Sequence, residues 1–130
     1  MNIKTPSFLR GWPPAILWMA LIFGLSSIPG SDFPEVPVPE INSIVHAIEY
    51  SILGVLLLRG FTYSFPGKPV FRLVLFAAGS AILFGLSDEW HQTFVQERFF
   101  ELQDLIVDAI SAVLGILLYI RKTELSLLTK

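Results

Sequence analysis

Four long apolar segments restrict what this chain can fold into. With their polar ends included, they lie at about residues 12–28, 44–63, 70–92 and 102–120. Each is close to the roughly 20 residues that cross a bilayer as a helix. Because backbone groups in lipid must find hydrogen-bond partners within their own segment, we expect helices. The sequence therefore predicts an all-α, integral membrane four-helix bundle.

The composition agrees with a membrane protein. Charged residues make up 15% of the 130 residues, whereas a soluble domain carries about 25%. The length suits a single domain over residues 1–130. The absence of cysteine excludes disulfides and thiolate chemistry. No basic patch interleaved with aromatic residues points to nucleic acid as a partner.

The first apolar segment has recognisable ends. Pro13 and Pro14 suit the first turn of a helix, and Pro29-Gly30 is expected to end it. A cleaved signal peptide is the alternative interpretation of this segment. No small-x-small cleavage site follows it, so we favour an uncleaved first span.

Basic residues lie on one side of a four-span arrangement. Eight of the nine Lys and Arg residues fall on that side, and Arg98 is the exception. Ten of the eleven acidic residues, all but Glu124, fall on the other side or near that end of a span. The positive-inside rule then predicts that both termini are cytoplasmic and that the first and third loops face outward.

The two outer loops differ in character. The first, from Pro29 to Ile41, is expected to be an extended, stiff strap without helix, because alternating prolines favour that conformation. The prolines concerned are Pro34, Pro37 and Pro39. The third loop, roughly Thr93 to Gln103, is short and carries Arg98.

Polar clusters interrupt the apolar pattern at the predicted outer ends of three spans. Side chains three or four residues apart share one face of a helix. The clusters are His46, Glu49 and Tyr50; Asp88, Glu89, His91 and Gln92; and Arg98, Asp104 and Asp108. Glu49 and Asp108 lie deepest, on the order of 6–9 Å inside their spans. Ionisable groups at that depth face a protein interior or a wet cavity, so we expect a crevice open to the outer leaflet.

Several kinds of chemistry suit such a crevice. Carboxylates beside two histidines can perform general acid–base catalysis. The same groups can bind a divalent metal through imidazole nitrogen and carboxylate oxygen, and the sequence leaves the presence of a metal open. Arg98 could hold a phosphate or carboxylate through its bidentate fork.

Structural roles are the alternatives to these functional ones. Asp104 could cap the fourth helix, and Asp88 could mark where the third helix leaves the bilayer. Glu49 and Asp108 could form a polar clamp between helices. Small residues of the third helix are interpreted as close helix packing, and they make a homodimer through that helix plausible. They are Ala77, Gly79, Ser80, Ala81 and Gly85.

Three runs of residues together resemble the VanZ-like family of bacterial membrane proteins. The first run is His46-Ala-Ile-Glu49-Tyr50-Ser-Ile-Leu-Gly54. The second is Ser87-Asp88-Glu89-Trp90-His91-Gln92-Thr-Phe-Val95, followed by Arg98. The third is Asp104-Leu-Ile-Val-Asp108-Ala-Ile-Ser-Ala-Val-Leu-Gly115. Their order and spacing cover about residues 44–118.

The chain departs from the family pattern at three places. Asn42-Ser43 stands where the family often has Asp-Lys before the histidine. Gln96-Glu97 replaces a common Pro-Gly before the arginine, which predicts a less sharply turned loop. Ser111 replaces a usual glycine in the last helix, a change of one small residue for another.

The resemblance implies a multi-pass protein of the bacterial cytoplasmic membrane, in a family whose founding member is associated with teicoplanin resistance. Our first hypothesis is an enzyme acting on an amphiphilic or lipid-linked envelope intermediate. Its catalytic residues would be Asp88, Glu89, His91 and Asp104, and its substrate-binding residues His46, Glu49, Tyr50, Gln92, Arg98 and Asp108. The second hypothesis is a non-catalytic scaffold or headgroup-binding protein. A small transporter is a weaker third, because the charges form no path through the cytoplasmic half.

Overall fold

The computed structural model describes residues 7–32 and 41–128. This part of the chain forms four α-helices and one short 3-10 helix, and it contains no strand. The elements are α1 (Ser7–Ser26), η1 (Gly30–Asp32), α2 (Ile41–Ser64), α3 (Val70–Gln92) and α4 (Leu102–Leu128). The predicted all-α, four-helix architecture is confirmed.

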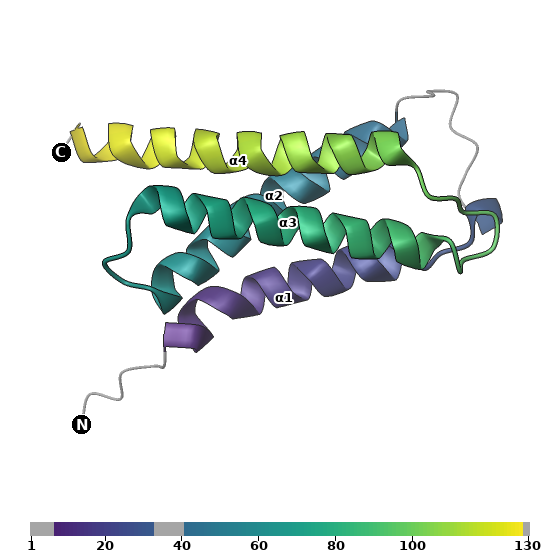
Figure 1. The fold of residues 1–130 in the computed structure, drawn as a ribbon, viewed down its shortest axis with the longest axis horizontal. Helices are drawn as coiled ribbons and strands as arrows, with labels where there is room; N and C mark the ends of the chain where they lie inside the picture. The colour runs from purple at the N-terminus through teal and green to yellow at the C-terminus, as the bar shows by residue number, and fades with distance from the viewer. Residues whose placement is uncertain (1–6, 33–40, 129–130) are drawn as a thin grey trace.

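The four helices run lengthwise beside one another (Figure 1). The start of α1, the turn between α2 and α3, and the end of α4 lie at one end of the bundle. The short helix η1 and the connection between α3 and α4 lie at the other end. All three other long helices pack against α2, and α4 does so most extensively. Each buried position of α2 therefore faces a neighbouring helix.

Two glycines allow α2 and α4 to approach closely. A Cβ atom added at Gly54 would lie 2.5 Å from the backbone oxygen of Ala112, and one added at Gly115 would overlap the backbone oxygen of Ser51. Small residues at such a contact let two helix backbones meet. Close packing is also predicted for the small residues of α3. Ala77, Ala81 and Gly85 are buried, as predicted, but Gly79 makes no such contact, because nothing beyond the backbone of its own helix lies within 4 Å of a Cβ placed there.

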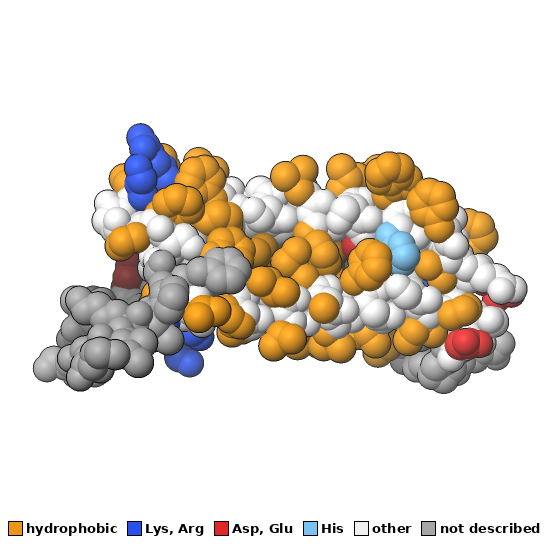
Figure 2. Space-filling view, turned by 90° about the horizontal axis from the view of Figure 1, so that it is seen from below, with side chains coloured by type: hydrophobic (Ala, Val, Ile, Leu, Met, Phe, Trp, Pro, Cys, Tyr) orange, Lys and Arg blue, Asp and Glu red, His pale blue; other side chains and the backbone are white. Residues whose placement is uncertain are grey.

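Apolar side chains cover the middle of the surface seen in Figure 2. Three helices are long and apolar enough to cross a membrane: Ile41–Ser64, Val70–Gln92 and Leu102–Glu124. Within the described residues, α1 is not among them, and its first half holds Arg10, Gly11, Trp12 and two prolines. In Figure 2 most of the visible basic side chains gather at one end, and most visible acidic and histidine side chains lie toward the other.

The beginning of α1 differs from the prediction. The helix begins at Ser7, so Pro13 and Pro14 lie inside it and not in its first turn. An interior proline cannot donate to the carbonyl one turn earlier. Contacts with α2 hold this part of the helix in place, since Trp12 donates a hydrogen bond from Nε1 to the Ser64 hydroxyl (2.7 Å) and packs on Gly60.

Two further expectations need correction. Residues 30–32 form the 3-10 helix η1, where a strap without helix was predicted. The prolines that favoured the strap lie outside the described residues. The helix α4 extends beyond the predicted residues 102–120, through Arg121 and Lys122, to Leu128. Charged residues take a helix out of a membrane, but Arg, Lys and Glu favour helix, so they do not end it.

Candidate functional site

Six polar side chains come together in the interior, near the η1 end of the bundle. This polar cluster consists of His46 from α2, Asp88, Glu89 and Gln92 from α3, and Asp104 and Asp108 from α4. All six are buried, and Asp88, Glu89 and Asp108 are each only 1% exposed. The helical spacing explains the convergence, because residues one turn apart share a face. The apolar spans thus enclose four carboxyl groups and one imidazole.

His46 joins the two carboxyl groups of α4. Its Nδ1 lies 2.9 Å from Oδ1 of Asp108, and its Nε2 lies 3.7 Å from Oδ2 of Asp104. When the carboxylate of Asp108 is ionised it can only accept, so the imidazole donates from Nδ1. The side-chain amide of Asn42 donates to Oδ2 of Asp104 (2.6 Å). These contacts connect α2 to α4 along the first turns of α4.

The two acidic residues of α3 have partners on other segments. The hydroxyl of Ser26, at the end of α1, donates to Oδ2 of Asp88 (2.6 Å). Glu89 accepts the backbone N–H of Glu101 at Oε2 (2.9 Å) and the amide of Gln92 at Oε1 (3.3 Å). The last turn of α3 is therefore attached to α1 and to the connection that leads into α4.

Three buried atoms in this region lack a hydrogen-bond partner among the described residues. They are Oδ1 of Asp88, Oδ2 of Asp108 and the hydroxyl oxygen of Tyr50. A buried polar group without a partner costs about 1–3 kcal/mol, and more when it is charged. The cluster therefore offers two acceptor oxygens for a donor or cation that the described part of the chain does not supply.

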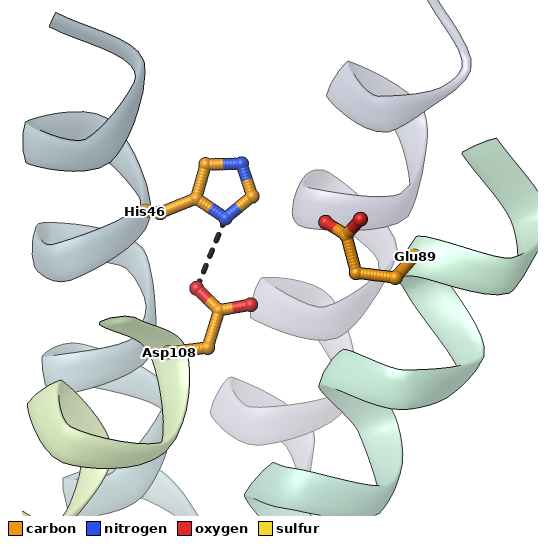
Figure 3. A group of neighbouring side chains, drawn as sticks. All are labelled: His46, Glu89 and Asp108. Carbon is orange, nitrogen blue, oxygen red and sulfur yellow. Dashed lines mark hydrogen bonds and ion pairs between the residues drawn. The ribbon is translucent and has the colours of Figure 1, made fainter. Parts of the chain in front are cut away.

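Three members of the cluster point toward a common space. His46, Glu89 and Asp108 reach it from three different helices, as Figure 3 shows. One side-chain nitrogen or oxygen of each lies within 4.8 Å of the corresponding atoms of the other two. One imidazole and two carboxylates form a donor set that holds divalent metals in proteins.

The other histidine lies outside this group. The ring of His91 stacks on Phe23 of α1, with centroids 4.1 Å apart. Its Nε2 lies 3.0 Å from the hydroxyl of Ser27, whose own proton is donated to the Phe23 carbonyl (2.7 Å). Nε2 is therefore the donor to Ser27. The structure thus places the two histidines in different surroundings, with His46 central and His91 against α1.

The remaining predicted site residues occupy the edge of the polar cluster. Glu49 is half-buried, and its backbone carbonyl accepts a hydrogen bond from Trp18 of α1 (2.9 Å). Tyr50 is fully buried, and its ring lies parallel to that of His46 at 6.3 Å between centroids. Arg98 donates from Nε to the carbonyl of Ile28 (3.3 Å), which connects the α3–α4 connection to the end of α1.

Residues 12–126 match the profile of the VanZ/LLP1 family. The chain belongs to the VanZ/LLP1 family. No curated protein and no solved structure matches it. The resemblance inferred from three short runs is thereby confirmed, and every residue of the polar cluster falls within the matched range.

Three polar partners in this VanZ/LLP1 protein were not predicted. They are Ser26, Ser27 and Asn42. Asn42 precedes His46 by four residues, so the same-face rule could have found it. No local signal pairs the two serines with α3, since those contacts depend on how α1 packs.

The position of Asp104 corrects one structural alternative. Asp104 is the third residue of α4 and does not precede the helix as an N-cap residue would. Its carboxylate accepts a hydrogen bond from the side-chain amide of Asn42, which belongs to a different helix, α2. The residue therefore links two helices at the edge of the polar cluster.

The connection between α3 and α4 also differs from the prediction. Arg98 donates its backbone N–H to the carbonyl of Val95 (3.2 Å), and Glu97 has a φ of 58°. A positive φ at the third residue of a four-residue turn is typical of a type II turn, which favours Pro-Gly at its centre. The turn is therefore sharp, although Gln96-Glu97 occupies these positions. Gly30 donates its N–H to the carbonyl of Gln96 (3.0 Å) and leaves room for Glu97.

Proposed function

We propose that this VanZ/LLP1 protein is a multi-pass protein of the bacterial cytoplasmic membrane that binds, and acts on, the polar head of an amphiphilic or lipid-linked envelope substrate. One observation carries the proposal. Four buried carboxyl groups from two apolar helices surround His46, and two of their oxygens have no partner within the described residues. Ionisable groups inside membrane spans are costly and mark functional sites by default.

The distribution of charge supports an outward-facing cluster. Apart from Arg98, the described basic residues lie near the helix ends opposite the polar cluster. They are Arg10 in α1, Arg59 in α2, Lys68 and Arg72 around the start of α3, and Arg121 and Lys122 in α4. Under the positive-inside rule this end faces the cytoplasm, with α1 as a fourth span. The cluster then lies in the outer half of the membrane, near the headgroups of the outer leaflet.

The contacts of His46 support a hydrolytic or group-transfer reaction. Asp108 holds Nδ1 of the imidazole (2.9 Å), which leaves Nε2 as the basic nitrogen. An oriented imidazole can take a proton from an attacking water or hydroxyl group. Asp88 and Glu89 would supply acid or electrostatic assistance, Asp104 would adjust the charge near Nε2, and His91 and Arg98 would contact the anionic head.

The experiment measures teicoplanin and vancomycin susceptibility in a Gram-positive host. Cells express the wild-type protein, Asp88→Asn, His46→Gln, or the control Glu124→Gln, at matched membrane levels. Glu124 is exposed near the opposite end of the bundle. We expect wild type and control to raise teicoplanin resistance and both cluster variants to lose that effect. If both cluster variants confer as much resistance as wild type, the polar cluster does not carry the function.

A non-catalytic scaffold is the second candidate, and the hydrogen bonds favour it. Three contacts of the polar cluster join different helices: Ser26 with Asp88, Asn42 with Asp104, and His46 with Asp108. Such bonds can fasten membrane helices together. Asp88→Asn separates the two candidates, because asparagine still accepts from Ser26 but lacks the charge. A scaffold would keep its effect on susceptibility, whereas an enzyme would lose it.

A further inference from the structure

We propose that His46, Glu89 and Asp108 form a binding site for one divalent metal ion of the Zn²⁺ or Mn²⁺ class. The ligands come from α2, α3 and α4, so the metal would fasten three helices at one point. The site does not depend on the reaction proposed above, because a metal bound to Nδ1 of His46 would replace the proton that this nitrogen donates to Asp108. Metal binding can be measured without any substrate.

The distances suit a metal ion. Nδ1 of His46 and Oδ1 of Asp108 are 2.9 Å apart, close to the roughly 3 Å between adjacent ligands of an octahedral ion with bonds of about 2.1 Å. The complete set of three ligand atoms lies within 4.8 Å. Opposite ligands of such an ion are about 4.2 Å apart. The three ligand atoms would therefore need to draw together by at most about 0.6 Å to reach that spacing.

A second observation points to a ligand in this space. Oδ2 of Asp108 is buried and has no hydrogen-bond partner among the described residues. In Figure 3 it points away from His46 toward the side on which Glu89 lies. Two carboxylates that face one buried space repel each other unless a proton or a cation lies between them. A divalent ion bound by both oxygens of Asp108 would satisfy the unpartnered Oδ2 and remove this repulsion.

The surroundings also favour a cation. Oδ2 of Asp104 lies 3.7 Å from Nε2 of His46, and Asp88 is buried beside Glu89 on the same turn of α3. These two carboxylates add negative charge around the proposed ligands. Residues that surround metal ligands commonly orient them and tune affinity. Asp104 and Asp88 would act in this way here, and the backbone N–H of Glu101 would fix the second oxygen of Glu89.

The donor set limits the choice of metal. Carboxylate oxygens alone suit Mg²⁺ or Ca²⁺, but an imidazole nitrogen favours first-row transition ions. The chain has no cysteine, so copper(I) and iron–sulfur clusters are poor matches. Among the remaining ions, Zn²⁺ binds more tightly than Mn²⁺ to the same ligands. Zn²⁺ is therefore the better probe.

The test titrates Zn²⁺ into the full-length protein in detergent, after removal of any affinity tag and treatment with a chelator. Variants are Glu89→Gln, which keeps an acceptor for Glu101, and Asp108→Asn, which keeps an acceptor for His46. The controls are His91→Gln and Glu49→Gln, a histidine and a glutamate near the same end but outside the group. Helical circular dichroism verifies that each variant is folded.

We expect one Zn²⁺ per wild-type chain and a rise in melting temperature on binding. Loss of a residue that only supports a metal ligand typically weakens affinity 10–100-fold, so each ligand variant should weaken it at least about tenfold. Both controls should bind within about twofold of wild type. The proposal is overturned if wild type binds no stoichiometric Zn²⁺, or if the controls weaken binding as much as the ligand variants. Neither outcome depends on teicoplanin susceptibility, so this test is independent of the test of the proposed function.

Discussion

The contact between α2 and α4 sets the geometry of the polar cluster, and a single methyl group tests this. Gly115→Ala or Gly54→Ala places a Cβ atom against the backbone of the opposite helix. His46 lies in α2 and Asp108 in α4, each within roughly two helical turns of these contacts. We therefore expect either substitution to separate His46 from Asp108.

The structure gives the size of the effect. The Cβ at Gly54 would lie 2.5 Å from the Ala112 oxygen, whereas Cβ atoms essentially never approach closer than 3.0 Å, so the helices must separate by at least about 0.5 Å. Adding that separation to the 2.9 Å between His46 and Asp108 brings it near the limit of a hydrogen bond. Overpacking of this kind costs typically about 1–3 kcal/mol of unfolding free energy.

Gly79→Ala is the matched control, because no atom lies within 4 Å of a Cβ at that position of α3. There the same methyl group should only add helix propensity, worth up to about 1 kcal/mol. The assay is equilibrium unfolding in mixed micelles, followed by far-ultraviolet circular dichroism. The imidazole nitrogen resonances of the two histidines report the His46 contact separately from stability.

We expect the substitutions at Gly54 and Gly115 to lower the free energy of unfolding. The substitution at Gly79 should leave it unchanged or raise it. The His46 resonance should shift only in the first two variants. Equal effects of all three substitutions would refute the packing argument. Destabilisation with an unchanged His46 resonance would refute the link between helix spacing and the polar cluster.

Three further substitutions test individual contacts. Glu97→Gly should stabilise the protein by roughly 0.5–1 kcal/mol in the same unfolding assay, because it relieves a φ of 58°; an equal gain from Glu97→Ala would show that charge is responsible. Asn42→Asp should lower the melting temperature, because it replaces the donor to Asp104 by a second carboxylate and costs about 1–3 kcal/mol; an unchanged melting temperature would contradict this contact. Ser26→Ala should increase hydrogen exchange in α1, because it removes a buried donor to Asp88. Ser27→Ala, which alters an exposed hydroxyl, should change exchange less.

The helices were largely predictable, because bilayer thickness fixes the length of an apolar segment. The sequence placed the start and end of α3 at the observed residues and those of α2 within three residues. It failed at the start of α1, where contacts of Trp12 with α2 keep two prolines inside a helix. The length of an apolar segment does not reveal such tertiary contacts.

The sequence predicts which polar residues share a helix face. It does not predict how each helix is rotated against its neighbours. Spacing correctly grouped Asp104 with Asp108 and Asp88 with Gln92. Spacing also grouped His91 with Asp88, but at about 100° per residue His91 lies roughly 60° from Asp88 on the side opposite Glu89. The packing of α3 turns Asp88 and Glu89 inward and leaves His91 against α1. Which histidine becomes central therefore depends on how the helix is rotated against its neighbours.

Glu97 illustrates how distant contacts decide a local conformation. Its sequence position predicted a relaxed turn, because a side chain disfavours positive φ. Two contacts between the α3–α4 connection and the end of α1 hold the sharp turn instead, one from Gly30 to Gln96 and one from Arg98 to Ile28. The same connection supplies the Glu101 N–H that holds Glu89 in the polar cluster. A strained turn and the proposed metal ligand are therefore coupled through a few residues, so relief of the strain should be accompanied by a measurable change in Zn²⁺ affinity.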